Sequence, residues 1–221
     1  MIKAVIFDLD GVLVHTDWFH YRAWKQLADE LAIPFDEACN QRLRGISRMD
    51  SLEYILKNSN LLYSPQQKIQ LAEKKNDTYK ALIAHMTTAD VEQEVLRTLE
   101  TLKKKGLRLG VGSSSKNARF ILDRTRLSPY FHAVVDGTMI EKAKPDPEVF
   151  IKAAALLGVA PKDAVVVEDA PAGIAAAKAG GFIAFAVGDA ISSALSDAVL
   201  YHFSDLPICL SNFNISSNKL Q

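Results

Sequence analysis

The chain has 221 residues, 48% hydrophobic and 24% charged, a composition typical of a globular protein with a sizeable core. Lysine plus arginine equals aspartate plus glutamate at 26 each, so the formal net charge is zero and no basic surplus indicates a nucleic-acid partner. The two cysteines lack the spacing of a zinc site or a disulfide framework, and the sequence has no clean apolar span or signal-peptide core. We therefore expect a cytoplasmic protein that binds no membrane.

Short runs rich in β-branched residues alternate with helical patterns over most of the chain. The first run, Ile2 to Phe7, is apolar on both faces, as a central strand of a parallel sheet is. Further strand-like runs lie at residues 107–112, 132–136, 164–167, 182–187 and 198–203, with helical patterns at 91–105, 116–126, 147–157 and 172–179. The Ser- and Asn-rich tail from Ser211 onward is expected to fray. The alternation predicts right-handed βαβ units and a Rossmann-like open parallel α/β sheet.

One long segment interrupts this alternation. After the first strand, roughly 70 residues show helical periodicity and no convincing strand. One helix in this segment begins with Ser64-Pro65-Gln66-Gln67, which combines an N-cap, a proline at the first position and a glutamine three residues after the cap. The segment is too long for a simple crossover. It predicts an all-helical cap domain at residues 16–87, inserted into an α/β catalytic core of residues 1–15 plus 88–221.

Polar residues follow the carboxyl ends of several predicted strands. They are Asp8 and Asp10 after the first strand, Ser113, Ser114, Ser115 and Lys116 after the second, Lys144 after the third, and Glu168 and Asp169 after the fourth. Ligands of open α/β sheets bind outside these strand ends. We therefore expect four acids, a lysine and a hydroxyl cluster to converge on one edge of the sheet.

This set of side chains suits phosphoryl transfer through an aspartate. A carboxylate that attacks a phosphate dianion is repelled by it, so a bound Mg²⁺ is needed between the two. Asp8, Glu168 and Asp169, with a backbone carbonyl, offer the hard oxygen ligands that Mg²⁺ prefers. Lys144 and Ser113 can hold the other phosphate oxygens by charge and by hydrogen bonding.

Asp8 and Asp10 are expected to differ in their protonation. Two like charges about 4 Å apart repel by about 4 kcal/mol at an effective dielectric constant near 20. We hypothesise that Asp8 stays ionised as the nucleophile and that Asp10 carries a proton as the general acid/base. Because an aspartyl phosphate hydrolyses readily, the helical insertion that begins shortly after Asp10 is expected to close over the site and exclude water.

Motifs across the whole core resemble those of the haloacid dehalogenase superfamily. They are Asp8-Leu9-Asp10-Gly11, the serine after the second strand, Lys144-Pro145 and Glu168-Asp169, with a helical cap inserted behind the first motif. In the cap, the segments His20 to Lys25, Arg44 to Arg48 and Lys75 to Asp77 resemble the β-phosphoglucomutases of that superfamily. This resemblance implies an isomerase that uses Mg²⁺ to interconvert β-D-glucose 1-phosphate and glucose 6-phosphate through an aspartyl phosphate and bound β-glucose 1,6-bisphosphate.

The resemblance also implies a role for each matching residue. Asp8 is the phosphorylated nucleophile, and Asp10 is the general acid/base whose carbonyl also reaches Mg²⁺, with Glu168 and Asp169 completing the metal site. The transferring phosphoryl group is bound by Ser113, Ser114 and Lys144, and the other phosphate by Arg48, Ser115, Lys116 and Asn117. The remaining matches are Thr16 and His20 at the hinge and start of the cap, as catalytic candidates, and Trp24, Arg44, Gly45 and Lys75 facing the substrate.

Arg44 departs from the pattern of the family, which usually has lysine before Gly45. The positive charge is kept, but a planar guanidinium replaces a point charge. The preferred sugar therefore stays open, and a mutase for another sugar 1-phosphate is an alternative.

A mutase needs a second phosphate pocket, because a bisphosphate must bind by either end. Arg48 with Lys116 would supply that pocket, which favours a mutase over the main alternative, a Mg²⁺-dependent sugar-phosphate phosphatase. A receiver domain would be about half as long and would lack the insertion, and the intact set of acids argues against a non-catalytic binding module. We expect the partner to be a small-molecule sugar phosphate and the enzyme to be a monomer, since the cap must move.

Overall fold

The computed structural model describes residues 1–43 and 46–218, with side chains through residue 213. The chain forms two compact units. The α/β unit consists of Met1–His15 and Thr87–Gln221, and the helical unit of Thr16–Met86. Among the described residues, no helix has both the length and the apolar character needed to cross a bilayer.

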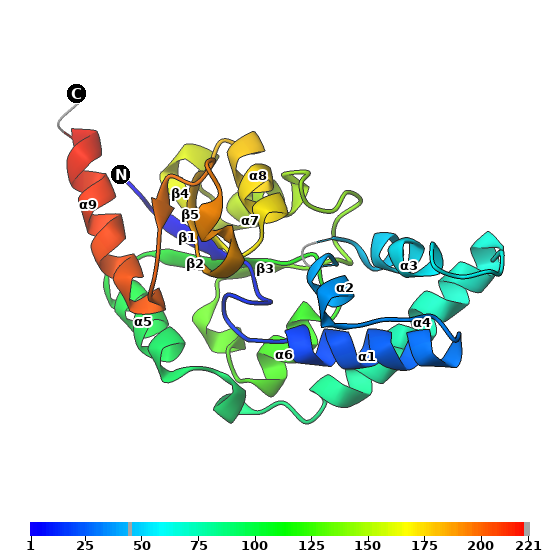
Figure 1. The fold of residues 1–221 in the computed structure, drawn as a ribbon. Helices are drawn as coiled ribbons and strands as arrows, with labels where there is room; N and C mark the ends of the chain where they lie inside the picture. Colours follow the sequence, from blue (N-terminus) through cyan, green and yellow to red (C-terminus); the bar gives the residue numbers. More distant parts are fainter. Residues whose placement is uncertain (44–45, 219–221) are drawn as a thin grey trace. The chain divides into compact units, whose positions relative to one another are not determined.

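The α/β unit is built on a parallel sheet, whose six strands within the described residues have the order β3-β2-β1-β4-β5-β6. The strands are β1 (Ala4–Phe7), β2 (Arg108–Gly112), β3 (Ala133–Val135), β4 (Ala164–Glu168), β5 (Ile183–Ala186) and β6 (Ala198–Val199). Helices α7 (Glu148–Leu157) and α8 (Pro171–Ala179) cover one face, and α5 (Gln93–Lys104), α6 (Ala118–Arg124) and α9 (Leu206–Asn218) cover the other (Figure 1). The predicted open parallel α/β sheet is confirmed.

Short 3₁₀ helices complete the connections of this unit. They are η1 (Thr88–Asp90), η2 (Ser128–Tyr130), η3 (Pro161–Asp163), η4 (Gly188–Ser192) and η5 (Phe203–Asp205).

The central strand β1 is buried on both faces, which explains its unbroken apolar run. Ile6 packs with Phe150 of α7 and Val166 of β4 in the core beneath α7 and α8. Phe7 points to the opposite face, where its ring lies 5.8 Å from that of Phe203. Burying each of these large side chains contributes roughly 1.5–3 kcal/mol, so the strand is held from both sides.

The C-terminal part of the chain differs from the expectation. Fraying from Ser211 is wrong for the residues that the structure describes, because α9 continues from Leu206 to Asn218. Leu206 and Leu210 are buried on one side of this helix, and the ring of Phe213 packs 5.2 Å from that of Phe185. A spacing of four and then three residues places all three side chains on one helical face. Packing of this face compensates for the low helix propensity of the serines and asparagines from Ser211 onward.

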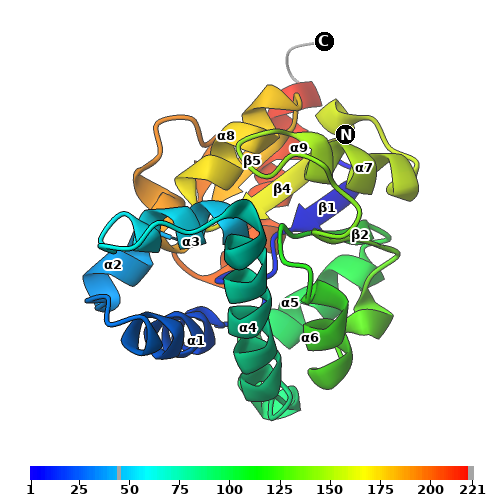
Figure 2. The same cartoon turned by 90° about the vertical axis from the view of Figure 1, so that its right-hand side faces the viewer.

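The helical unit has its own core. Its helices are α1 (Asp17–Glu30), α2 (Glu37–Gln41), α3 (Arg48–Leu56) and α4 (Pro65–Ile83). Helix α4 contacts both α1 and α3, and α2 contacts α1 (Figure 2). Trp24 and Leu27 of α1 pack with Leu52 of α3 and with Ala72 of α4. The predicted start of α4 is confirmed: Gln67 N donates to the N-cap hydroxyl at 3.3 Å, and the N-cap N–H donates to Gln67 Oε1 at 2.8 Å.

Candidate active site

The carboxyl ends of β1 and β4 bring three acids together. The two strands are parallel neighbours, and the N–H of Asp8 donates to the carbonyl of Val167 at 3.0 Å. One carboxylate oxygen each from Asp8, Glu168 and Asp169 lies within 4.8 Å of the other two. All three side chains are buried. Such a set of hard oxygen donors fits a divalent cation such as Mg²⁺.

Lys144 lies between two of these acids. Its ammonium group donates to Oδ1 of Asp8 and, at 2.8 Å, to Oε2 of Glu168. The lysine is buried, with Nζ 4.6 Å from the ring centre of Phe150. One ammonium among three buried carboxylates leaves negative charge to be compensated, which is a second reason why a cation fits here.

Burial and charge act on these groups in opposite ways. Burial lowers the pKa of Lys144, but the negative charges of Asp8 and Glu168 outweigh it, so this pKa lies above its usual value. Burial raises the pKa of Glu168 to about 8; Lys144 opposes the shift, and repulsion from Asp8 and Asp169 adds to it. A divalent cation bound to the carboxylates would favour their ionised forms.

Gly173, in the first turn of α8, makes room for Glu168. A Cβ atom at position 173 would lie 2.0 Å from Cδ of Glu168, so a side chain there would displace the carboxylate. Sequence reasoning gave this glycine no role. The signal that could have found it is a glycine inside a helical pattern, where alanine is more stable by about 1 kcal/mol unless packing forbids it.

The loop Ser113–Asn117 follows β2, which pairs with β1 on the side away from β4. Within the loop, Ser115 N donates to Ser113 Oγ at 3.0 Å, and Asn117 N donates to Ser115 Oγ at 3.2 Å. Because these hydroxyl oxygens accept from the backbone, their O–H groups are left to donate. Ser114 Oγ is buried and has no hydrogen-bond partner among the described residues. The loop therefore offers hydroxyl donors at the edge where Asp8 lies.

Asp10 lies on the tight turn that follows Asp8. The N–H of Gly11 donates to the carbonyl of Val14 at 2.7 Å, and Gly11 has φ +86°, a conformation that glycine adopts without steric cost. The turn leaves the side chain of Asp10 partly buried.

In the helical unit, His20 and Trp24 of α1 meet Lys75 of α4. Lys75 Nζ lies 3.0 Å from His20 Nδ1 and 4.6 Å from the ring centre of Trp24, and the lysine is buried. Thr16, also buried, precedes α1, and its carbonyl accepts from His20 N at 3.0 Å. The pKa of His20 lies well below its usual value, mainly because of burial and to a smaller extent because of the positive charges of Lys75 and Arg48.

Arg48 is the first residue of α3, and burial lowers its pKa. Arg44 and Gly45 lie outside the described residues. The structure thus brings the predicted residues together in two groups, one in each unit. The predicted phosphate clamp of Arg48 and Lys116 draws on both units and stays a prediction.

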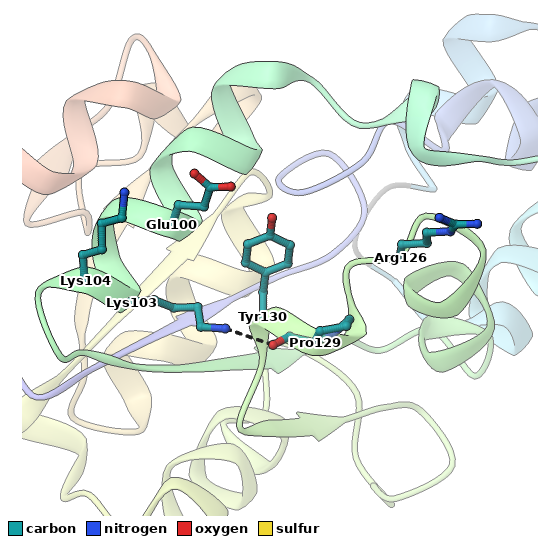
Figure 3. A pocket seen from close by; sticks show the side chains of 6 residues that line it. All are labelled: Glu100, Lys103, Lys104, Arg126, Pro129 and Tyr130. Carbon is teal, nitrogen blue, oxygen red and sulfur yellow. Dashed lines mark hydrogen bonds between the residues drawn. The ribbon is translucent and has the colours of Figure 1, made fainter.

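A second feature of the α/β unit is a pocket of about 420 Å³ (Figure 3). It is lined by Glu100, Lys103, Lys104, Arg126, Pro129 and Tyr130. Lys103 and Lys104 end α5 just before β2, and residues 126–130 come just before β3. These are the amino ends of the strands, so the pocket lies at the edge of the sheet opposite the acids.

Comparison with known proteins agrees with this geometry. The family model of haloacid dehalogenase-like hydrolases matches residues 2–181. A β-phosphoglucomutase of Bacillus subtilis is 44% identical over 209 residues, which cover 94% of this chain and 92% of the relative. A phosphorylated carbohydrates phosphatase of Thermotoga maritima is 30% identical over 81% of this chain and 82% of the relative. The crystal structure of a β-phosphoglucomutase from Clostridium difficile is 33% identical, with a TM-score of 0.91 and all of both chains covered. The chain belongs to the haloacid dehalogenase-like hydrolase family.

Proposed function

We propose that the protein is a β-phosphoglucomutase, which interconverts β-D-glucose 1-phosphate and glucose 6-phosphate through a phosphorylated Asp8. One observation carries the proposal: the buried carboxylate of Asp8 is held by Lys144 beside Glu168 and Asp169 at a single sheet edge. Likeness to two β-phosphoglucomutases, one in sequence over 94% of the chain and one in fold over all of it, supports the same reaction.

Three carboxylates would hold Mg²⁺ in this enzyme. Asp8, Glu168 and Asp169 supply hard oxygen ligands close enough to share one ion, and the backbone carbonyl of Asp10 would be a further ligand. When bound, the ion would offset the repulsion between the carboxylate of Asp8 and the phosphoryl oxygens.

Asp8 and Asp10 would share the chemistry. The C6 hydroxyl of β-glucose 1-phosphate attacks the phosphorus on phosphorylated Asp8, the bond between Asp8 and phosphorus breaks, and Asp10 takes the hydroxyl proton. The β-glucose 1,6-bisphosphate formed then binds by its other end. The carboxylate of Asp8 attacks the phosphorus at C1, the bond from phosphorus to O1 breaks, and Asp10 returns the proton to O1. Glucose 6-phosphate leaves, and Asp8 is phosphorylated again, so added bisphosphate would activate the enzyme.

The other predicted residues would bind the two phosphates and the sugar. Ser113, Ser114 and Lys144 would bind the transferring phosphoryl group, and Arg48, Ser115, Lys116 and Asn117 the other phosphate. The helical unit would act as a cap, with Thr16 and His20 at its hinge and Trp24, Arg44, Gly45 and Lys75 toward the sugar. Since phosphorylated sugars are anions that do not cross membranes unaided, we also propose a cytoplasmic location. A monomer leaves the cap free to move.

A sugar-phosphate phosphatase is the second candidate. The specific observation in its favour is the 30% identity to the phosphorylated carbohydrates phosphatase of Thermotoga maritima. The two reactions share the phosphorylation of Asp8 and differ in what attacks next: water in a phosphatase, a sugar hydroxyl in a mutase.

A coupled assay distinguishes the two candidates. The protein, with Mg²⁺ and trace β-glucose 1,6-bisphosphate, is given the β or the α anomer of glucose 1-phosphate, while glucose 6-phosphate and free phosphate are measured together. We expect glucose 6-phosphate from the β anomer, with far less free phosphate. Free phosphate that outpaces isomerisation would establish the phosphatase instead.

Two variants test the role of Asp8. Asp8→Asn should lose at least ~10³-fold of either activity, because an amide is not a nucleophile at neutral pH. Asp29→Asn, which removes an exposed acid paired with Lys25, should behave like the wild type. Undiminished isomerisation by Asp8→Asn would overturn the proposal.

A further inference from the structure

The loop Ser113–Asn117 is held in place by the turn that follows β3. β2 and β3 are neighbouring parallel strands, and their backbone contact continues beyond the ends of both. Ser113 N donates to the carbonyl of Val135 at 3.0 Å, and Gly137 N donates to the carbonyl of Ser115 at 3.1 Å. The conformation of the loop therefore depends on a segment more than twenty residues further along the chain.

Gly137 lies against the loop backbone with no room for a side chain. A Cβ atom at position 137 would lie 2.3 Å from the carbonyl oxygen of Ser114 and 3.0 Å from the nitrogen of Lys116. Both are backbone atoms, which cannot move aside as the end of a flexible side chain can. Gly137 does not have a positive φ, so space rather than backbone conformation calls for glycine there.

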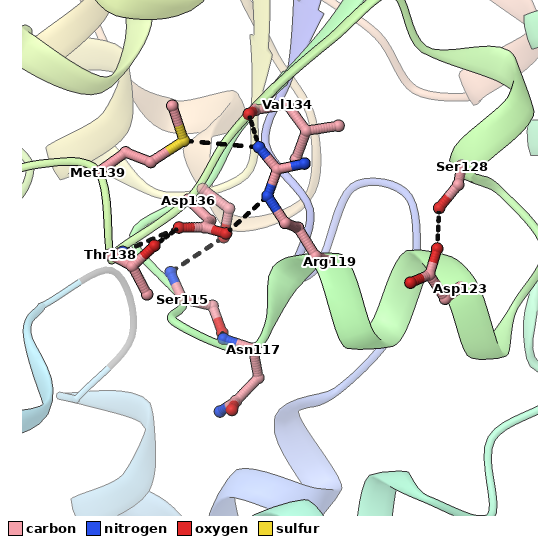
Figure 4. Close-up of polar contacts among 10 residues, drawn as sticks. Ser115, Asn117, Arg119, Asp123, Ser128, Val134, Asp136, Thr138 and Met139 are labelled. Carbon is pink, nitrogen blue, oxygen red and sulfur yellow. Dashed lines mark hydrogen bonds and ion pairs between the residues drawn. The ribbon is translucent and has the colours of Figure 1, made fainter.

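An ion pair between the buried Asp136 and the exposed Arg119 ties the far end of the same loop (Figure 4). Asp136 is buried, and its Oδ1 accepts from Thr138 N at 2.9 Å. Its Oδ2 lies 3.2 Å from Nε of Arg119, which is in the first turn of α6, directly after the loop. Nη2 of Arg119 also donates to the carbonyl of Val134 at 2.7 Å. One guanidinium thus connects the start of α6 to the end of β3.

We propose that Gly137 and the pair Asp136–Arg119 are positioning residues for phosphate binding. They act through the loop Ser113–Asn117. The backbone hydrogen bonds to Val135 and Gly137 hold the beginning and middle of the loop, and the absence of a side chain at position 137 lets the loop lie close to the turn after β3. The ion pair holds the end of the loop. The inference rests on the proposed function for the assignment of this loop to phosphate. It adds three residues that lie outside the proposed contacts with substrate.

Gly137→Ala is the first test. It should push Ser114 and Lys116 away and raise the dissociation constant of inorganic phosphate, measured calorimetrically with Mg²⁺ present, by about 10- to 100-fold. The KM for the sugar phosphate should rise in parallel, while Mg²⁺ affinity stays as in the wild type, because the three carboxylates lie elsewhere. Backbone amide chemical shifts should change in the loop and not at Glu168.

Gly106→Ala is the matched control. Gly106 has φ +75°, and no neighbouring atom lies within 4 Å of the place that a Cβ would take, so alanine there strains the backbone without touching the loop. It should lower the stability of the protein and leave phosphate affinity unchanged. If both alanine variants lose affinity equally, or if Gly137→Ala binds phosphate like the wild type, the inference is overturned.

Arg119 gives a graded test of the ion pair. Arg119→Met should raise the dissociation constant of phosphate by about ten-fold. Arg119→Lys should raise it by less, because lysine keeps the charge but lacks the separate Nε and Nη2 donors with which the guanidinium reaches Asp136 and Val134. Equal affinities in all three proteins would exclude a positioning role for the pair.

The phosphate measurement separates this inference from the proposed reaction. A wild type that binds phosphate but makes no glucose 6-phosphate would refute the mutase, and the affinities of the variants would still decide the role of the turn. A wild type that binds no phosphate would overturn both.

Discussion

Lys75 Nζ lies 3.0 Å from His20 Nδ1 in the helical unit, and the two side chains come from helices that pack on each other, α4 and α1. The same ammonium group stands 4.7 Å from the ring centre of Tyr79. An ammonium group can only donate, so His20 accepts at Nδ1 and, when neutral, carries its proton on Nε2. The contact therefore favours a neutral imidazole beside a charged lysine.

This arrangement predicts that the protein loses stability in mild acid. Burial and the nearby cations hold the pKa of His20 well below its ordinary value, so the unfolded chain takes up a proton first as the pH falls. His20 makes its full contribution to the free energy of unfolding above pH about 6.5. Below that pH the contribution falls by at most about 1.4 kcal/mol per pH unit. Urea unfolding between pH 7.5 and 5 should show a shallower dependence for His20→Gln than for the wild type.

His85→Gln is the control for that comparison. His85 is an exposed histidine of the same unit, so its replacement removes an imidazole without touching the contact between His20 and Lys75. Identical slopes for the wild type and His20→Gln would contradict the prediction.

Lys144→Met should destabilise the α/β unit strongly at pH 8. The substitution leaves buried carboxylates without their ammonium partner, which typically costs about 3–5 kcal/mol. The deficit should be larger above pH 8 than below it, because Lys144 opposes the burial that raises the pKa of Glu168 to about 8, so without the lysine this carboxyl takes up its proton at a higher pH than in the wild type. Saturating Mg²⁺ should restore more stability to this variant than it adds to the wild type. Chemical unfolding with and without Mg²⁺ measures both effects.

Lys152→Met provides the matched comparison for Lys144. Lys152 forms a partly exposed pair with Glu148 one helical turn away, and pairs of this spacing are worth about 0.3–0.5 kcal/mol on a helix surface. Similar losses of stability in the two methionine variants would show that the buried lysine has no special role.

Gly173→Ala should weaken Mg²⁺ binding by about 10- to 100-fold, since the new methyl group would displace the carboxylate of Glu168. Alanine usually stabilises a helix relative to glycine by about 1 kcal/mol, so a loss of affinity here would have to come from the clash. Calorimetric titration with Mg²⁺ tests this. An unchanged affinity together with higher stability would mean that Glu168 adapts at no cost.

Ser64→Ala should lower the free energy of unfolding by about 1 kcal/mol, because it removes the hydroxyl that accepts the N–H of Gln67 at the start of α4. Ser64→Asp keeps an acceptor at the N-cap and should recover most of the loss. Equilibrium unfolding of both variants measures these differences in the free energy of unfolding. If alanine and aspartate behave alike, the cap does not contribute measurably.

Much of the fold could be predicted from local patterns. The apolar run that became β1 and the capping residues before α4 are decided by neighbours in the chain, which is why they can be found without a structure. Helix α9 could not be found in this way. From Ser211 onward its sequence is mostly serine and asparagine, which favour turns over helices, and the packing of Phe213 against Phe185 depends on where the sheet lies.

For the candidate site, the sequence by itself determined which groups lie at the carboxyl ends of the strands, since this follows from strand periodicity and the parallel direction of the sheet. Only the tertiary structure decided that Lys144 bonds Asp8, 136 positions away, and that Gly137 and Gly173 leave space for a loop and a carboxylate. The physical reason is that strand periodicity depends only on residues that are close together in the sequence. Close approach between distant residues depends on strand order and on the volume that packing leaves free.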